Sequence, residues 1–366
     1  MENRITRQVT DAGLSSTPPH GISRYEILEE YAQGGGSILY LANDLALCRI
    51  VMLKKLRPDM AKDESSQQRF LREARVTAII QHPAVVPVYD IGRDEDGCPY
   101  FSMKRVEGVT LRKIIDEAVG MNPEFERFRT RGQLVDVVIR VAQAVAFAHE
   151  HGVIHRDIKP SNVIIGDFGE VFVMDWGVAH VEGDGKEDAS GRNDIETSDD
   201  KELTAHGSVY GTPLYMAPEQ ARGECGADPR SDVFSLGSLL YESLTYRPLV
   251  VGLEREEIIR KIQREPFIPP RKREPMRMIP VELEAICMKA LERETGERYA
   301  DVKAMIDDLQ RCQRGDTVKA MDESSLIRAR RWIRKRLSKE LLVAFLLGCL
   351  CGYALTWGKW GVAGGE

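Results

Sequence analysis

Short apolar runs separated by polar turns occupy the first third of the chain, from Tyr25 to Met103, and runs of this length predict strands. The segment Gln67–Gln81 differs, because its apolar residues recur at helical spacing until His82-Pro83 ends the pattern. Residues 24–103 are therefore expected to form a twisted antiparallel sheet with one helix. The predicted strands lie within residues 25–28, 31–40, 49–56, 85–89 and 99–103.

After Glu107-Gly108 the apolar spacing becomes helical. A long helix is predicted from Gln133 to His151, and Gly152 follows it, as is common at helix C-termini. Apolar runs at 163–165 and 171–174 predict a hairpin around Gly166-Asp167-Phe168-Gly169. Further helices are expected over residues 111–117, 231–244, 254–264, 281–291 and 299–312. The order of elements predicts an α+β fold, with a β-rich lobe at about 24–104 and a helical lobe at about 108–313.

The segment from His155 to Asn162 carries the most chemistry. It holds a carboxylate at Asp157, an ammonium at Lys159 and an amide at Asn162, and Pro160 stiffens the turn by fixing φ. Such a loop can offer a base to a hydroxyl, a cation to a phosphate oxygen and a ligand to a metal ion. Phosphoryl transfer needs those three parts, because its catalysis is mostly positioning and charge neutralisation. The alternative is a solvated charged loop, but the joint occurrence at this spacing favours a site.

Two further features fit phosphate chemistry less specifically. Gly34, Gly35 and Gly36 lie between strand-like runs, where backbone N–H groups could approach phosphate oxygens, although such runs also form simple hairpin turns. Lys54 lies in an apolar strand, and the alternative is a lysine that extends from the strand end to solvent. Glu73 lies on the apolar face of the predicted helix. A buried carboxylate needs a partner, and Lys54 is the natural candidate.

Together, and in this order, these motifs resemble those of the eukaryotic-like serine/threonine protein kinases of bacteria. The resemblance covers about residues 24–313. It implies a two-lobed protein-kinase fold with ATP bound between the lobes. It also implies Mg-ATP as the phosphoryl donor, with Mn²⁺ as an alternative ion, and Ser or Thr hydroxyls of protein substrates as acceptors.

The resemblance assigns roles to single residues. Lys54 matches the position that holds the α- and β-phosphates, and Glu73 matches the helix position that orients this lysine. Asp157 matches the base that orients the acceptor hydroxyl. Lys159 matches the γ-phosphate contact that marks Ser/Thr specificity, and Thr212 matches the residue that bonds the catalytic aspartate and shapes the acceptor site.

Other matched positions surround the nucleotide or support the site. Met103 falls at the gatekeeper position, and the backbone of Lys104 and Val106 falls where adenine is bound. Glu219 and Arg298 match a buried ion pair that braces the helical lobe, and Asp232 matches the residue that supports the catalytic loop. The residues expected to contact ATP are Gly34, Gly35, Gly36, Leu39, Met52, Lys54, Glu73, Met103, Lys104, Val106 and Ile164.

Two Asp-aromatic-Gly triplets compete for the metal-binding role. Asp167-Phe168-Gly169 has the family's usual letters, but it follows Asn162 too closely to leave room for both hairpin strands. Asp175-Trp176-Gly177 has that room. The resemblance therefore assigns the Mg²⁺ ligands to Asn162 and Asp175, with Trp176 in the usual Phe position. Trp can fill the same slot, but its N–H needs a hydrogen-bond acceptor.

Several departures from the family pattern support an alternative. Ala32 and Ser37 replace usual glycines, and Met52 replaces a small residue above adenine, which should crowd the pocket. Lys104-Arg105 places two charges in the connection between the lobes. None of these removes a charge that the chemistry requires. The alternative function is nevertheless a pseudokinase that serves as a membrane-tethered binding or scaffold module.

Arg156 precedes the proposed base, and in this family such kinases usually depend on a phosphorylated activation loop. Thr204 and Ser208 are the expected autophosphorylation sites, and the alternative is that both are ordinary loop hydroxyls. Residues 178–210 are predicted to be a mobile loop. Its acidic stretch at 182–202 is interpreted as a solvated insertion in preference to an autoinhibitory mimic.

Composition and charge limit the possible partners and the cellular compartment of the protein. The chain has 366 residues, a hydrophobic content of 43% and a net charge of −6, so it has no global basic field that would favour nucleic acid. Seven cysteines show no paired metal-binding spacing and indicate reduced thiols in a cytosolic environment. Residues 1–23 are polar, lack the apolar run of a signal peptide and are interpreted as a flexible leader.

The C-terminal region has a separate pattern. Residues 341–357 contain no charged residue, and 328–339 carry seven Lys or Arg and no acid. We expect a basic juxtamembrane segment (314–339), a transmembrane helix (340–358) and a short tail (359–366). Seventeen residues span about 26 Å as a helix, and flanking Trp and Lys residues extend that to the bilayer thickness. The basic flank predicts a single-pass protein of the cell inner membrane with a cytoplasmic kinase domain. The alternative is a buried C-terminal helix.

Gly348 and Gly352 form a GxxxG pair within this run. Such pairs allow two transmembrane helices to approach closely, so a homodimer that brings two kinase domains together is one hypothesis. The other is that glycine is simply common in membrane helices.

Overall fold

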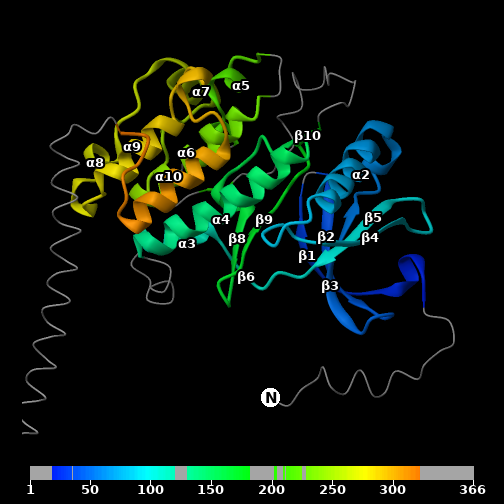
Figure 1. The fold of residues 1–366 in the computed structure, drawn as a ribbon. Helices are drawn as coiled ribbons and strands as arrows, with labels where there is room; N and C mark the ends of the chain where they lie inside the picture. Colours follow the sequence, from blue (N-terminus) through cyan, green and yellow to red (C-terminus); the bar gives the residue numbers. More distant parts are fainter. Residues whose placement is uncertain are drawn as a thin grey trace, which may run out of the picture.

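Two lobes make up the part of the chain that the structure describes, and the polypeptide crosses between them after β5 (Figure 1). The structure is a computed structural model that describes residues 19–34, 36–119, 130–181, 202–203, 209–210, 212–224 and 228–321. A sheet-rich N-lobe and a helical C-lobe confirm the predicted protein-kinase fold. Within those ranges no helix is long and apolar enough to cross a bilayer, and the predicted span at 340–358 lies outside them.

The N-lobe is built on a five-stranded antiparallel sheet in the order β1-β2-β3-β5-β4. Helix α2 begins at Glu64, three residues before the predicted start, because the Asp63 carboxylate caps it and accepts from the backbone N–H of Ser66 at 2.9 Å. The elements are η1 (Gly21–Arg24), β1 (Tyr25–Gln33), β2 (Ser37–Asp44), β3 (Arg49–Leu56), η2 (Met60–Lys62), α2 (Glu64–Ile79), β4 (Val88–Arg93) and β5 (Pro99–Lys104).

The segment before β4 departs from the prediction. The apolar run at 85–89 reads as a strand, but β4 begins only at Val88. Val85 forms an isolated parallel bridge with Val173, whose N–H donates to the carbonyl of Ala84 at 2.8 Å. The apolar residues at 84–86 are therefore buried against the C-lobe hairpin. This contact helps to fix the position of one lobe on the other.

The C-lobe surrounds helix α4, whose buried residues join one large apolar core. Thr130 and Gln133 form a capping box that starts α4 at Arg131. The elements are β6 (Gly108–Thr110), α3 (Leu111–Val119), α4 (Arg131–Glu150), β7 (Val153–Ile154), η4 (Pro160–Asn162), β8 (Val163–Gly166), β9 (Val171–Val173), β10 (His180–Val181), β11 (Glu202–Leu203), β12 (Val209–Tyr210), η6 (Thr212–Tyr215), α5 (Pro218–Ala221), α6 (Arg230–Thr245), α7 (Arg255–Arg264), α8 (Pro270–Arg273), η7 (Pro275–Arg277), α9 (Val281–Ala290), η8 (Thr295–Glu297) and α10 (Val302–Arg314).

The end of the C-lobe differs from the prediction in two places. The last helix, α10, begins at Val302 and not at Tyr299, because Asp301 caps it and accepts from the N–H of Ala304 at 2.7 Å. The short helix α8 was not predicted, since a single turn gives no periodicity to read. The predicted hairpin is confirmed as β8 and β9, which pair with β6 in a three-stranded sheet.

A buried ion pair links α5 to the loop before α10. Arg298 donates to both carboxylate oxygens of Glu219, at 2.8 and 2.6 Å, and also to the backbone carbonyls of Glu292, Arg230 and Arg293. The Arg298 side chain has no exposed surface. The expected pair is therefore present, and one guanidinium contacts three separate chain segments, at Glu219, at Arg230 and at Glu292–Arg293.

We expect Arg298→Met to lower the free energy of unfolding by about 3–5 kcal/mol, because it leaves a buried carboxylate and several carbonyls without their donor. Urea unfolding measures this. The exposed pair Lys303–Glu150 provides the matched control, and Lys303→Ala should leave the free energy of unfolding nearly unchanged. Equal losses for the two variants would show that burial does not matter at Arg298.

Candidate functional site

The loop from His155 to Asn162 is held from below by Asp232 of α6. The Asp232 carboxylate is fully buried and accepts from the backbone N–H groups of His155 and Arg156, at 2.8 and 2.9 Å. His149 at the end of α4 makes a further contact, with 2.7 Å between its Nε2 and Asp232 Oδ2. Burial alone would raise the pKa of Asp232, but these partners outweigh it and lower the pKa. The loop is thus anchored to the C-lobe core through a buried anion.

Three predicted residues converge inside this loop. Asp157 is 9% exposed, and its Oδ2 lies 3.1 Å from Lys159 Nζ and 3.1 Å from Asn162 Nδ2. The same Nδ2 donates to the Asp157 carbonyl at 2.9 Å, which leaves Asn162 Oδ1 as the oxygen that could face a cation. Burial raises the pKa of Asp157, Lys159 opposes the rise and Asp175 adds to it.

A second group lies on the N-lobe side. Lys54 of β3 contacts Glu73 of α2, with 2.6 Å between Nζ and Oε1, which confirms the pairing expected from the sequence. Burial lowers the pKa of Lys54, but Glu73 and Asp175 outweigh it, so the net pKa is raised and Lys54 is a cation. Asp175 is close to this pair, as the position that a Cβ would occupy at Gly177 shows. That position is 3.2 Å from Asp175 Oδ1 and 3.4 Å from Glu73 Oε2.

The backbone around these residues takes rare conformations. Arg156 and Asp175 have φ values of 67° and 60°, in the left-handed region that non-glycine residues seldom adopt. Each costs free energy that the surrounding structure must offset. Strained residues of this kind often occur at functional sites, and here Arg156 precedes the candidate base while Asp175 is itself a candidate metal ligand.

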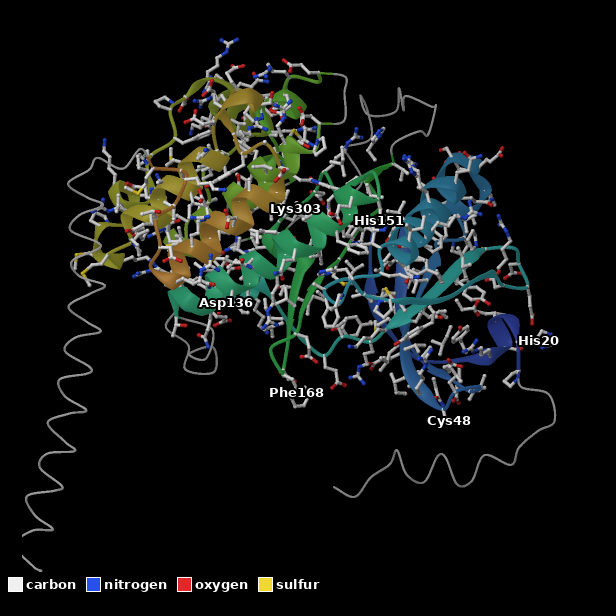
Figure 2. The ribbon with its side chains drawn as sticks, viewed as in Figure 1. His20, Cys48, Asp136, His151, Phe168 and Lys303 are labelled. Atoms are coloured by element: carbon white, nitrogen blue, oxygen red, sulfur yellow. The ribbon has the colours of Figure 1, made fainter. Side chains whose placement is uncertain are left out.

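The two Asp-aromatic-Gly triplets occupy different environments. Asp167 lies in the turn between β8 and β9, next to Phe168, which is 94% exposed and projects from the hairpin tip (Figure 2). Asp175 follows β9, is exposed, and lies beside the Lys54–Glu73 pair. The structure thus brings Asp175, and not Asp167, close to Lys54.

Trp176 is 1% exposed and packs against His155 in a tilted arrangement, with 4.4 Å between ring centroids and 48° between ring planes. Its indole N–H has no hydrogen-bond acceptor among the described residues, so the need anticipated from the sequence is unmet there. We expect Trp176→Phe to change the free energy of unfolding by less than about 1 kcal/mol, because relieving a buried donor offsets the lost volume. Thermal or urea unfolding tests this. A loss of about 3–5 kcal/mol, as for ordinary aromatic truncations, would contradict it.

An apolar cluster joins the N-lobe sheet to helix α2 and to strand β9. It contains Leu39, Met52, Met103 and Val106, four of the residues expected around ATP. Phe172 of the C-lobe strand β9 packs into the same cluster, and Lys104 Nζ lies 4.7 Å from the centre of its ring. Sequence reasoning missed Phe172, because its alternation in a hairpin strand does not reveal which lobe its side chain meets. Ile164 pairs with Phe172 across the hairpin.

For the remaining predicted site residues, the structure gives only the position along the backbone or no description. Gly34 and Gly36 lie in the turn between β1 and β2, where the Gly34 N–H donates to the Ser37 carbonyl at 2.9 Å. A Cβ at Gly36 would meet no atom within 4 Å. Thr212 begins η6. Outside the described residues lie Gly35, Thr204, Ser208, Gly348 and Gly352.

Glu242 is the centre of a second buried hydrogen-bond network, which was not predicted from the sequence. Glu242 of α6 has no exposed surface and accepts from Arg112 of α3 at 2.6 Å and from the Tyr215 hydroxyl at 2.5 Å. Tyr215 ends η6, the segment that begins at Thr212. An acid within the apolar pattern of α6 was the available signal, because such a residue needs buried partners.

Comparison with known proteins agrees with this geometry. Residues 25–309 match the protein kinase domain family. The chain is 39% identical over 308 residues to the serine/threonine-protein kinase PknB of Mycobacterium tuberculosis, a match that covers 83% of this chain and 45% of the relative. It is 38% identical over 308 residues to PknB of Mycobacterium leprae, with the same coverage. It is 35% identical over 291 residues to PknD of Protochlamydia amoebophila, covering 78% of this chain and 29% of that protein.

The chain therefore spans less than half the length of these relatives. The family match nevertheless covers both lobes and every element that carries the site, from β1 into α10. The chain belongs to the protein kinase domain family.

Proposed function

We propose that this chain is a serine/threonine protein kinase that transfers the γ-phosphoryl group of ATP to Ser or Thr hydroxyls of protein substrates. The observation that carries the proposal is the convergence of Asp157, Lys159 and Asn162 on one loop, together with the Lys54–Glu73 pair and Asp175. A pseudokinase is not favoured, since none of the charges that phosphoryl transfer requires is missing.

Each charged group has a role in this proposal. Lys54, held by Glu73, neutralises the α- and β-phosphates. Asp157 accepts a hydrogen bond from the acceptor hydroxyl and takes its proton as the hydroxyl oxygen bonds to the γ-phosphorus, while the bond from that phosphorus to the β–γ bridging oxygen breaks and ADP leaves. Lys159, 3.1 Å from Asp157, is placed to neutralise charge on the transferred phosphoryl group. Thr212 supports the acceptor site, and it begins η6, whose last residue, Tyr215, donates a hydrogen bond to Glu242.

Asn162 and Asp175 are the residues that would hold a Mg²⁺ or Mn²⁺ ion. Their chemistry fits, because Asp175 is an exposed carboxylate and Asn162 has an amide oxygen left free by its Nδ2 contacts. Among the described residues, no group of three or more His, Cys, Asp or Glu side chains gathers as a self-sufficient metal site. Phosphate oxygens would complete the coordination, and the ion would neutralise their charge.

The adenine ring is proposed to lie on the apolar cluster of Leu39, Met52, Met103 and Val106. Ile164, which pairs with Phe172 of that cluster, is proposed to contact the other side of the ring. Backbone groups of Lys104 and Val106 would bind its edge, and Gly34, Gly35 and Gly36 would cover the phosphates. Met52 pairs with Met103 across β3 and β5 and is 7% exposed, so it already fills part of this space. Its flexible side chain can adjust to a ligand.

The raised pKa of Asp157 predicts how activity depends on pH. The base must be ionised, so kcat should fall as pH decreases through a pKa that lies above the ordinary value of 3.8. Lys159 holds this pKa down, so Lys159→Met should move the acid limb of the kcat profile to higher pH. Initial rates from pH 5 to 8 measure this. An acid limb that shifts to lower pH would contradict the electrostatic assignment.

The direct test is phosphate transfer from γ-labelled ATP by the full chain, followed by phosphopeptide mapping. We propose Thr204, and then Ser208, as autophosphorylation sites that pair with Arg156. Label on either residue supports both the activity and its regulation. Transfer to substrate with neither site occupied would remove the regulatory proposal alone. ATP binding without transfer would favour the pseudokinase.

We further propose that residues 340–358 anchor the protein as a single-pass helix in the cell inner membrane, with the kinase domain cytoplasmic. The support is the uncharged run at 341–357 and the basic segment before it. Gly348 and Gly352 would allow two such helices to form a homodimer. Unchanged self-association of the full chain in detergent after both glycines are replaced by Ile would remove the dimer proposal.

A further inference from the structure

An exposed edge of the C-lobe combines apolar and basic side chains outside the candidate site. Met276 and Met278 are 91% and 81% exposed, two of the three most exposed large apolar residues in the described part of the chain. Arg271 and Lys272 lie beside them and form no ion pair with any described residue. We propose that this basic apolar edge, defined as Arg271, Lys272, Met276 and Met278, binds the surface of an anionic lipid bilayer.

The edge is held in a fixed shape. Prolines at 269, 270, 275 and 280 restrict the backbone across α8 and η7. Arg277 stacks over Tyr246, with 3.5 Å from its Cζ to the ring centroid, and its carbonyl accepts from Arg131 at 2.8 Å. The two methionines on either side of Arg277 are therefore presented to solvent by an ordered segment, which lowers the entropy cost of binding a surface.

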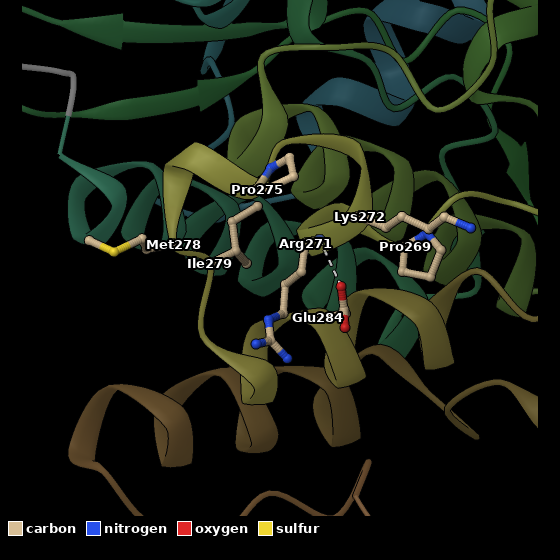
Figure 3. Close-up of a pocket in the computed structure, with 7 residues that line it drawn as sticks. All are labelled: Pro269, Arg271, Lys272, Pro275, Met278, Ile279 and Glu284. Atoms are coloured by element: carbon tan, nitrogen blue, oxygen red, sulfur yellow. Dashed lines mark hydrogen bonds between the residues drawn. The ribbon is translucent and has the colours of Figure 1, made fainter.

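A pocket of about 570 Å³ lies in this part of the C-lobe, between α8 and the start of α9 (Figure 3). Its lining includes Arg271, Lys272 and Met278, which extend in different directions around it (Figure 3). Glu284 also faces the pocket, but its carboxylate accepts from the Arg271 backbone N–H at 2.7 Å. Two cations that form no ion pair with a described residue lie around this recess and suit a phosphate headgroup, and the neighbouring methionines suit the acyl boundary beneath it.

The chain leaves the described structure near this edge. The backbone N–H groups of Lys319 and Ala320 donate to the Asp308 carboxylate. The same carboxylate accepts from the Tyr299 hydroxyl. Lys289 of α9 lies over the Tyr299 ring, so the end of the described chain is linked to α9. The other end of α9 contacts the basic apolar edge through Glu284. Lys289 and Glu284 are five residues apart, which is about 8 Å along a helix.

The sequence that follows explains why a bilayer is the occupant. Residue 341 begins the uncharged run, and about twenty extended residues reach at most about 70 Å from residue 321. This inference rests on the proposed membrane anchor, which would keep the edge at a high local concentration near lipid. The basic segment at 328–339 and the edge carry the same charge, so both suit an anionic leaflet. Helices α8 and α9 lie at the end of the C-lobe far from the N-lobe, so binding there leaves the candidate site accessible (Figure 1).

Hydrogen exchange of the full chain in vesicles tests the proposal. Amides of residues 268–281 should exchange at least about fivefold more slowly in vesicles with 30% phosphatidylserine than in pure phosphatidylcholine. The variant Arg271→Glu/Lys272→Glu/Met276→Ser/Met278→Ser should abolish that difference. The matched control, Leu253→Ser/Arg255→Glu/Arg260→Glu, alters an exposed leucine and two cations of the same lobe and should retain it.

The outcomes separate the edge from the anchor. If the amides of residues 341–357 are protected from exchange but lipid does not slow exchange at 268–281, the anchor stands and lipid binding by the edge is overturned. An acidic protein would then be the remaining candidate to bind the edge. Slowing that persists in the fourfold variant would also overturn lipid binding by the edge. Slowing at 268–281 without protection of 341–357 would support the edge and remove the anchor. No slowing in either segment would overturn both.

Discussion

Asp157→Asn is expected to lower kcat for phosphoryl transfer by about 10²–10⁴-fold while leaving ATP binding in place, because a positioned base contributes that much. The carboxylate is nearly buried and lies 3.1 Å from both Lys159 Nζ and Asn162 Nδ2. An amide has the same shape but can neither take a proton nor balance the Lys159 charge. Binding should survive, because the Lys54–Glu73 pair and the apolar cluster are untouched.

Initial rates with γ-labelled ATP measure the effect, and the thermal shift on adding Mg-ATP measures binding. The control is that the variant keeps the unfolding temperature of the unmodified chain to within a few degrees. A variant that retains more than about a tenth of kcat would show that Asp157 does not act as the base.

Asp175→Asn is expected to reduce activity by at least about 10²-fold and to raise the Mg²⁺ concentration needed for half-maximal rate, since it removes a charged ligand. The reason lies in geometry. Asp175 is exposed, and its carboxylate and that of Glu73 both lie beside Gly177. Its charge raises the pKa of Lys54 and of Asp157.

Asp167→Asn is the matched control, because Asp167 belongs to the same kind of triplet but lies in the turn between β8 and β9. We expect it to retain kcat and the Mg²⁺ dependence within about twofold, in line with the small effects of most surface substitutions. If Asp167→Asn were the inactive variant and Asp175→Asn the active one, the metal-site assignment would have to be reversed.

Much of the fold follows from local pattern. The period of apolar residues predicts α2, α4 and α6, and the two runs around Gly166-Asp167-Phe168-Gly169 predict the β8–β9 hairpin. The predicted ends of the elements were less accurate than the predicted types of the elements. Asp63 and Asp301 cap α2 and α10 through side-chain contacts, which shifted both starts by three residues.

The sequence by itself also predicts the chemistry of the candidate site, because the residue types and their spacing in the loop from His155 to Asn162 suit phosphoryl transfer. It could not determine what depends on contacts between distant segments. Val85 reads as a strand residue but bridges the two lobes, Phe172 lies in a C-lobe hairpin but packs with the N-lobe cluster, and His149 supports Asp232 from another helix. The exposure of Met276 and Met278 likewise depends on how α8 and η7 pack, since an apolar residue in the sequence predicts burial. Local periodicity reflects short-range backbone geometry, whereas burial and partner choice are decided only when the whole chain packs.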